Sequence, residues 1–243
     1  MYTIFLSLFI LWSSPANPVT DTKNSNDISA EQQHIYDLYN SLKPNGKIPD
    51  FELFYKGLAG YNNLTEKNLI KNKNYLTLID FTASSNEKRL WVIDLDSMKV
   101  KYHELVAHGK NTGNEYARHF SNTTGSYQSS LGFFVTAEPY YGKHGLSLRL
   151  DGVEPGINDK ARSRAIVLHG ADYVNQNFIS KYGRLGRSLG CPAVSTTVNK
   201  DLINTIKEGS CLFIYYPDAS YFSMSELVPE NTPKADYISE LNY

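Results

Sequence analysis

The chain has 243 residues, of which 41% are hydrophobic and 20% are charged, and its formal net charge is −1. These values are typical of a globular protein and exclude a disordered or collagen-like chain. The balanced charge argues against a globally basic nucleic-acid-binding protein. Two cysteines are too few for a disulfide-dense scaffold or a four-cysteine zinc site.

The N-terminus carries an uncharged apolar run at 2–12, followed by small residues at Ser14 and Ala16. This pattern predicts a signal peptide over 1–16, although no Lys or Arg precedes the apolar run. The alternative is a buried N-terminal strand or helix. Residues 17–27 are polar and are expected to form a linker. No apolar run reaches the ~18–20 residues of a membrane-spanning helix, so we expect an exported protein without an integral membrane segment after signal cleavage.

Two amphipathic helices are predicted next. Ser29 and Gln32 fit a capping box, and Asp50 fits the N-cap of a second helix. Apolar side chains then recur at helical spacing in both stretches, namely Ile35, Leu38, Tyr39 and Leu42, and Phe51, Phe54, Tyr55 and Leu58. We therefore expect residues 28–73 to form a small helical hairpin that packs against a larger domain.

From Tyr75 onward the sequence predicts strands and turns. Short runs rich in Leu, Ile, Val and Tyr are separated by turn residues, at 75–81, 89–95, 99–106, 131–136, 146–150, 164–168 and 211–216. One amphipathic helix with its apolar residues at Val198, Leu202, Ile203 and Ile206 precedes the last strand. Residues 74–217 are thus predicted to be a mainly β domain with one late helix, followed by a C-terminal tail at 218–243.

The residues that carry chemistry lie between 165 and 195. His169 and Gly170 end a strand-like run, and Cys191 follows Gly190 in a turn. A nearby imidazole allows a thiol to form the reactive thiolate, so these residue types indicate a Cys–His catalytic pair. Gly190 permits an unusual backbone angle. The amides of Gly190 and Cys191 are the expected donors to a developing oxyanion, because Pro192 has no N–H.

Two structural alternatives remain open for this pair. Cys191 could form a disulfide with Cys211 or be an inert packed thiol, and His169 could be a hydrogen-bonded core histidine. Cys211 lies in an apolar strand-like run, where it is expected to behave as a small buried hydrophobe.

The segment 159–187 is basic, with six Lys or Arg and two Asp, a local charge of +4. Positive charge near a cysteine lowers its pKa and attracts carboxylates. Arg184 and Arg187 are the preferred candidates for substrate binding because they lie closest to Cys191 in sequence. The alternative is a solvated basic loop.

The pattern His169-Gly170, seventeen residues, then Ser188-Leu189-Gly190-Cys191 resembles the signature of the L,D-transpeptidases, which is His, a variable run, and Ser/Thr-His-Gly-Cys. Residues 120–133 and 140–150 resemble the murein L,D-transpeptidase catalytic-domain branch of that family. The resemblance covers about residues 75–216.

This resemblance implies a sandwich-like β domain and a peptidoglycan substrate, without a cofactor. Cys191 would be the nucleophile and His169 its base, while Ser188 and Gly190 would shape the turn. The thiol would attack the stem peptide before the terminal D-Ala, and the thioester would pass to a second stem as a 3→3 cross-link. Such a protein would work in the periplasm or cell envelope of a bacterium. The alternatives are an L,D-carboxypeptidase or hydrolase on the same stems, or a non-catalytic wall-binding module.

The sequence departs from the family pattern at Leu189, where most members carry His, and at Pro192-Ala193, where an aliphatic residue and Arg or Asn are usual. Arg187 is therefore the candidate to place the stem peptide. Further substrate-binding candidates are Gly170, Tyr140 and His144, with an exposed loop histidine as the alternative for His144. We expect no metal, because the sequence has no HExxH, CxxC or acidic cluster, and no nucleotide.

Overall fold

The computed structural model describes residues 29–228. The predicted signal peptide (1–16), the linker (17–27) and the end of the C-terminal tail (229–243) lie outside the described residues. Within residues 29–228, the helices are all too short or too polar to span a bilayer.

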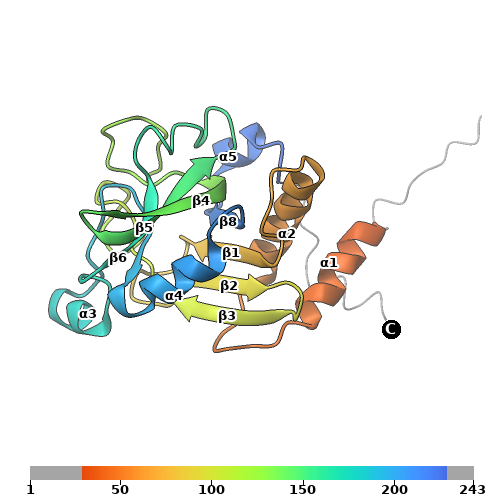
Figure 1. Ribbon diagram of the computed structural model, residues 1–243, viewed down its shortest axis with the longest axis horizontal. Helices are drawn as coiled ribbons and strands as arrows, with labels where there is room; N and C mark the ends of the chain where they lie inside the picture. Colours follow the sequence, from red (N-terminus) through yellow and green to blue (C-terminus); the bar gives the residue numbers. More distant parts are fainter. Residues whose placement is uncertain (1–28, 229–243) are drawn as a thin grey trace, which may run out of the picture.

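The two predicted N-terminal helices are present as α1 (Ala30–Asn40) and α2 (Phe51–Glu66). Ser29 forms the expected capping box and the Asp50 side chain caps α2. The helices meet through aromatic rings, with Tyr39 and Phe51 centroids 5.1 Å apart. The ribbon shows α2 lying between α1 and the sheet (Figure 1), so the hairpin is anchored to the β domain through α2.

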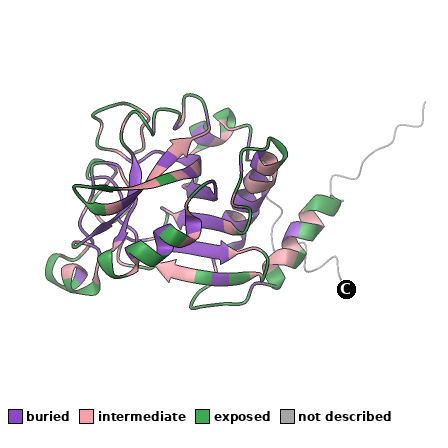
Figure 2. Cartoon of the chain, in the orientation of Figure 1, coloured by how far each residue is buried: buried purple, intermediate pink, exposed green. Residues whose placement is uncertain are grey.

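Eight strands form one mixed sheet in the order β3-β2-β1-β8-β4-β5-β6-β7. They are β1 (Tyr75–Asp80), β2 (Leu90–Asp94), β3 (Lys99–Glu104), β4 (Gly132–Gly142), β5 (Gly145–Gly152), β6 (Val167–Ala171), β7 (Ala193–Ser195) and β8 (Cys211–Tyr215). The predicted mainly β class is confirmed. Figure 2 shows the buried residues concentrated on the central strands and along much of α2.

The sheet almost closes on itself. Ala107, shortly after edge strand β3, pairs with Ala193 of the opposite edge strand β7. The amide of each donates to the carbonyl of the other, at 2.8 and 3.2 Å. The sandwich-like arrangement is therefore built from one continuous, strongly curved sheet around a shared core, in which the rings of Phe133 and Phe213 stack at 4.2 Å.

The late helix is confirmed as α4 (Thr196–Ile206), which packs over β5, β6 and β7. Two short helices that the sequence did not predict, α3 (Gln176–Tyr182) and α5 (Ala219–Met224), flank it in the chain. Each is too short to show an apolar period. Strand β6 begins at Val167 instead of residue 164, because Ala165 adopts a left-handed backbone with φ 55° and interrupts extended pairing.

Candidate active site

Strand pairing brings the predicted Cys–His pair together. His169 lies in the middle of β6, which runs parallel to β7 with His169 opposite Ala193. Cys191 comes two residues before Ala193, so its side chain reaches the start of β6, where the Val167 N–H donates to Sγ at 3.5 Å. Both His169 and Cys191 line one cavity of about 340 Å³. The fold thus gives the thiol and the imidazole a common solvent space.

The turn that carries Cys191 is held by Ser188. The Ser188 hydroxyl donates to the Cys191 carbonyl at 2.6 Å and accepts from the Gly190 N–H at 3.0 Å. Gly190 has φ 127°, and a Cβ at this position would lie 2.9 Å from the carbonyl oxygen of Gln128. Any other residue would be strained there and would crowd the neighbouring loop. The motif residues Ser188 and Gly190 therefore fix the shape of the turn.

The structure changes one expectation about the oxyanion donors. The Gly190 N–H already donates to Ser188 Oγ, so it is not free for a substrate. Among the described residues, the Cys191 N–H has no partner other than its own side chain. The backbone donor that remains at this turn is the amide of Cys191, and a second donor has to come from another element.

The imidazole of His169 is oriented by the backbone. Its Nδ1 lies 2.9 Å from the carbonyl oxygen of Gly170. A carbonyl can only accept, so Nδ1 carries the proton and Nε2 carries the lone pair. Nε2 has no hydrogen-bond partner in residues 29–228. Burial lowers the pKa of His169, and the charges of His144 and Lys143 lower it further, against the effect of the Gly170 carbonyl. The neutral imidazole is therefore the resting form.

The thiol of Cys191 is also neutral at rest. Burial raises its pKa, while the Val167 N–H and the charges of Arg164 and Lys143 lower it. Sγ donates weakly to the Ala165 carbonyl at 3.7 Å. The structure records no hydrogen bond between the described Cys191 and His169 side chains, so the resting site is a thiol beside an imidazole. Both cysteines are free thiols.

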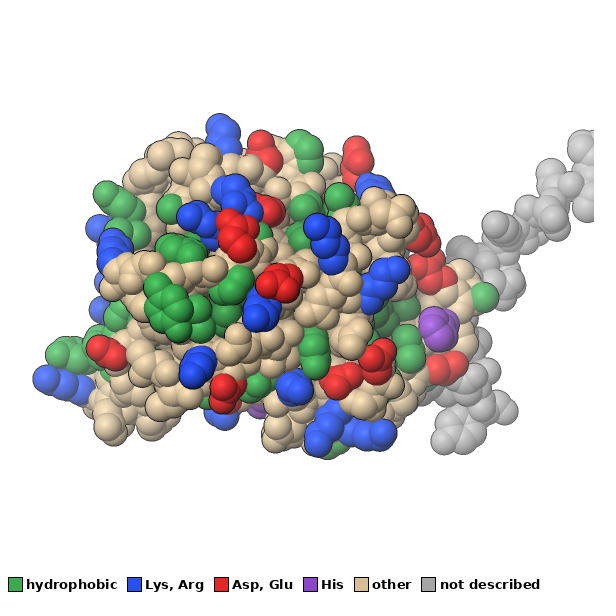
Figure 3. Space-filling model, in the orientation of Figure 1, with side chains coloured by type: hydrophobic (Ala, Val, Ile, Leu, Met, Phe, Trp, Pro, Cys, Tyr) green, Lys and Arg blue, Asp and Glu red, His purple; other side chains and the backbone are tan. Residues whose placement is uncertain are grey.

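The cavity is lined by basic side chains and by no Asp or Glu. Both Nη atoms of Arg164 donate hydrogen bonds to protein acceptors. Arg187 uses Nη1 for three acceptors in the loop after β3, and its Nη2 is left unbonded by the described residues. Lys143, in the β4–β5 turn, makes no hydrogen bond or ion pair with the described chain. On the outer face shown in Figure 3, by contrast, basic and acidic side chains are interspersed. The cavity is therefore suited to an anionic ligand.

The remaining predicted site residues divide into two groups. Tyr140, His144 and Arg187 line the cavity with Cys191, His169 and Ser188. Gly170 lies behind His169 and contributes only its carbonyl. Arg184 bonds the carbonyl of the following residue at 2.7 Å and does not line the cavity.

Three ionisable side chains that line the cavity were not predicted from the sequence. Arg164 and Lys143 place charge near Cys191, and Tyr173 also lines the cavity. Burial and the nearby Cys191 raise the pKa of Tyr173 to about 12, so its hydroxyl remains a proton donor. Arg164 stands within the basic segment, where its charge was visible in the sequence. Lys143 directly precedes His144, a predicted site residue, but was not itself predicted, and nothing in the sequence placed Tyr173 at the cavity.

A metal centre is not formed in the described range, where no cluster of three or more His, Cys, Asp or Glu side chains could hold an ion.

The protein is thus a mainly β domain in which a thiol and an imidazole line one basic cavity. The family model described as the L,D-transpeptidase catalytic domain matches residues 46–215, well over half of the chain. The chain belongs to this family. The matched range includes α2, so it begins earlier than the resemblance seen in the sequence. No curated protein sequence matches the chain significantly.

Solved structures similar to this chain share little sequence with it. An L,D-transpeptidase from Mycobacterium smegmatis is 11% identical over 59% of this chain and 59% of that one, with a TM-score of 0.38. An L,D-transpeptidase from Stackebrandtia nassauensis is 13% identical over 80% and 97% of the two chains, at 0.35. The helical cell-shape-determining protein of Campylobacter jejuni is 10% identical over 88% and 63%, at 0.39. The chain thus spans about three fifths of the length of the first of these proteins.

Proposed function

We propose that this protein is a peptidoglycan L,D-transpeptidase that forms 3→3 cross-links through a thioester on Cys191. The observation that carries the proposal is the shared cavity, into which His169 and Cys191 both open within an L,D-transpeptidase catalytic domain. A pair of this kind supplies a nucleophile and a base that line the same cavity.

The reaction follows from the resting protonation states. His169 Nε2 takes the thiol proton as Sγ attacks the carbonyl carbon of the third stem residue. The Cys191 N–H donates to the developing oxyanion, and the protonated imidazole then gives its proton to the amine of the leaving D-Ala. The side-chain amine of a second stem attacks the thioester and loses a proton to His169. The departing Cys191 sulfur takes that proton, which restores the neutral thiol and imidazole. Each proton and bond is accounted for by these two side chains.

The substrate class fits the charge of the cavity. Stem peptides carry free carboxylates, and the lining supplies Lys143, Arg164 and Arg187 without an opposing Asp or Glu. Lys143 and the free Nη2 of Arg187 are the donors still available to such a carboxylate. The exposed Leu189 offers an apolar contact where most family members carry a histidine.

We propose that the protein is exported and acts in the periplasm or cell envelope of a bacterium, where peptidoglycan is found. The apolar N-terminal run supports export. Membership of the L,D-transpeptidase family also supports it, because such enzymes act on the cell wall.

The test is mass spectrometry of purified tetrapeptide muropeptides after incubation with the mature protein. We expect a cross-linked dimer that has lost one D-Ala. Cys191→Ala should form none, and Cys211→Ala is the matched control because Cys211 is fully buried in β8, away from the cavity.

The products decide between the candidate activities. Tripeptide monomer alone would mean that water takes the acyl group, and the protein would be an L,D-carboxypeptidase. An unchanged muropeptide together with an unreactive Cys191 thiol would overturn the proposal in favour of a wall-binding module.

A further inference from the structure

His144 lies against the proposed base. Its ring stacks on the ring of His169 with centroids 4.4 Å apart and an interplanar angle of 21°. His144 itself is exposed, whereas His169 retains 2% of its accessible surface. One face of the buried imidazole is therefore covered by an exposed side chain.

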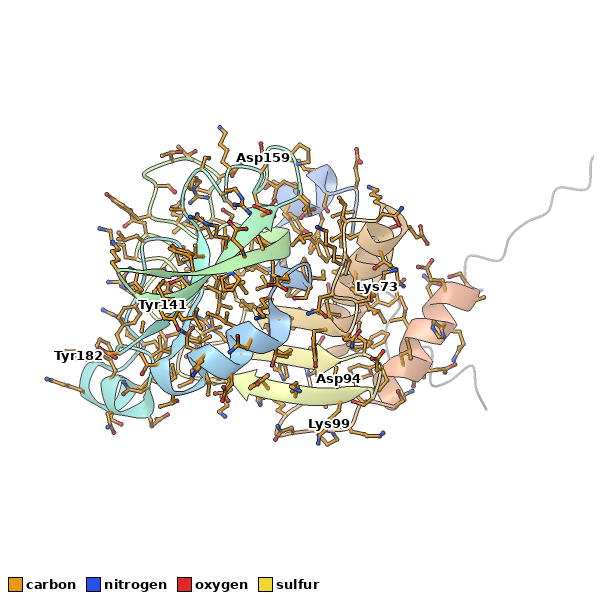
Figure 4. The ribbon with its side chains drawn as sticks, in the orientation of Figure 1. Lys73, Asp94, Lys99, Tyr141, Asp159 and Tyr182 are labelled. Carbon is orange, nitrogen blue, oxygen red and sulfur yellow. The ribbon has the colours of Figure 1, made fainter. Side chains whose placement is uncertain are left out.

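The β4–β5 hairpin delivers this ring. Gly142 pairs with Gly145, so Lys143 and His144 form a two-residue turn between the strands. Gly145 has φ 73°, a conformation that few other residues adopt. Tyr141, labelled in Figure 4, marks the end of this hairpin. Further along β5, Ser147 pairs directly with His169, so the hairpin end extends beside the strand that carries the base.

We propose that His144 is a positioning residue, which holds the imidazole of His169 in the plane that keeps Nε2 turned toward Cys191. This inference rests on the proposed pairing of His169 with Cys191. This role is different from the substrate binding expected from the sequence, because the ring contacts the base itself.

Two constraints on the base complement each other. The bond from Nδ1 to the Gly170 carbonyl selects which edge of the ring faces inward. A single bond at one edge still allows the ring plane to tilt, and a stacked ring opposes that tilt. Proton transfer from a thiol depends steeply on such alignment.

The site thus has a second imidazole, although the sequence has Leu189 where most family members carry a histidine in the motif. The two positions lie on different elements, since Leu189 precedes the nucleophile and His144 tops a hairpin. His144 contacts the face of the His169 ring. A contact of this kind orients the base.

The experiment compares His144→Ala and His144→Phe, because phenylalanine keeps a ring face and removes the nitrogens. The first readout is alkylation of Cys191 by iodoacetamide at pH 7 in a Cys211→Ala background. His169→Ala gives the alkylation rate without the base. His119→Ala is the control, since His119 is exposed and does not line the cavity. The second readout is kcat and KM on tetrapeptide muropeptides, with thermal unfolding to show that each variant is folded.

We expect His144→Ala to slow alkylation by about 10-fold and to lower kcat by a similar factor with little change in KM, since the misaligned base transfers the thiol proton less well. His144→Phe should recover both rates to within about 3-fold, because the stacked face is restored. His119→Ala should behave as the parent protein.

Other outcomes would overturn the inference. A raised KM with unchanged alkylation would return His144 to substrate binding. Equal losses in the Ala and Phe variants would mean that a ring nitrogen, not the ring face, is needed. If muropeptides are not turned over at all, the alkylation series alone decides the positioning role, and the proposed function fails separately.

Discussion

Two buried histidines of this protein illustrate how burial and hydrogen bonding set the role of an imidazole. His108 and His169 retain 1% and 2% of their accessible surface. Burial is the main cause of a lowered pKa in both, to about 3 for His108. Both are therefore neutral, and burial alone does not distinguish the core histidine from the candidate base.

The difference lies in their nitrogens. His108 Nδ1 accepts from Arg89 Nη2 at 2.8 Å, and its Nε2 donates to the Gly113 carbonyl at 3.3 Å. An arginine can only donate, so this tautomer is fixed and no lone pair is left. His169 satisfies one nitrogen with the Gly170 carbonyl and leaves the other at a cavity. An imidazole with one unpaired nitrogen beside a thiol can act as a base, whereas one with both nitrogens paired is structural.

The two regions are also connected. The Gly113 carbonyl accepts from both His108 Nε2 and Arg187 Nη1, and the His108 carbonyl accepts from the Ser188 N–H at 3.0 Å. The Arg89–His108 pair therefore supports the loop against which the Cys191 turn is built. Separate substitutions in the two regions should separate activity from stability.

The largest expected effect is on catalysis. His169→Ala removes the base, and kcat on muropeptides should fall by about 10² to 10⁴. The melting temperature should change by only a few degrees, because one hydrogen bond and one ring contact are lost. Single-turnover assays with parallel thermal unfolding measure both quantities. A large loss of stability with retained turnover would reverse the assignments of the two histidines.

His108→Ala should have the opposite profile. It leaves the fully buried Arg89 guanidinium without one acceptor, so the free energy of unfolding should fall by about 2–4 kcal/mol. Turnover per folded molecule should stay within a few-fold of the parent protein. Urea unfolding and active-site titration of Cys191 provide the measurements. Unchanged stability would show that the Arg89–His108 bond contributes little.

The pH dependence of stability should reflect His108. Its folded pKa of about 3 lies below the ordinary 6.5, so the stability is complete above pH 6.5. Below that, the unfolded chain binds a proton that the folded chain excludes, and stability falls as the pH approaches 3, at up to about 1.4 kcal/mol per pH unit. His169 adds to the same trend. His108→Asn keeps an acceptor for Arg89 without titrating, so its unfolding free energy should depend less steeply on pH; an identical slope would contradict this.

The smallest expected effect concerns the charge of the cavity. Lys143→Gln should lower the ratio of iodoacetate to iodoacetamide alkylation of Cys191 by about 3-fold, because an exposed charge contributes modestly to anion binding. The ratio cancels any change in thiol pKa, which affects both reagents alike. Lys181→Gln on α3 is the matched control. An unchanged ratio would leave Arg164 and Arg187 as the source of anion preference.

Much of the fold could be predicted from local sequence patterns. The caps at Ser29 and Asp50 and the periodic apolar residues located α1, α2 and α4 within a few positions. Each strand except β7 was predicted from an apolar run, and β7 has only three residues, too few to show a period. The start of β6 was placed three residues early, because the left-handed backbone at Ala165 has no signature in a non-glycine residue.

The residues of the candidate site that belong to one spaced motif were predicted, whereas residues that reach the site from distant segments were missed. His169, Ser188, Gly190 and Cys191 stood out as a motif, and the structure brings them to one place. Proximity in sequence favoured Arg184, whose guanidinium faces its own backbone. Tyr173 reaches the cavity from a loop that no local pattern marks, and Lys143 was not predicted although its neighbour His144 was.

The sequence by itself determined which chemistry was available: one motif cysteine, one motif histidine, and the alternating and helical periods that bury a mainly β core. Only the tertiary structure decided which donors are free. The Gly190 N–H donates to Ser188. Several N–H groups of Arg164 and Arg187 donate to backbone carbonyls, and His144 stacks on the proposed base. The reason is physical, since burial and hydrogen-bond pairing are properties of neighbours in space, and the near closure of the sheet makes distant segments neighbours.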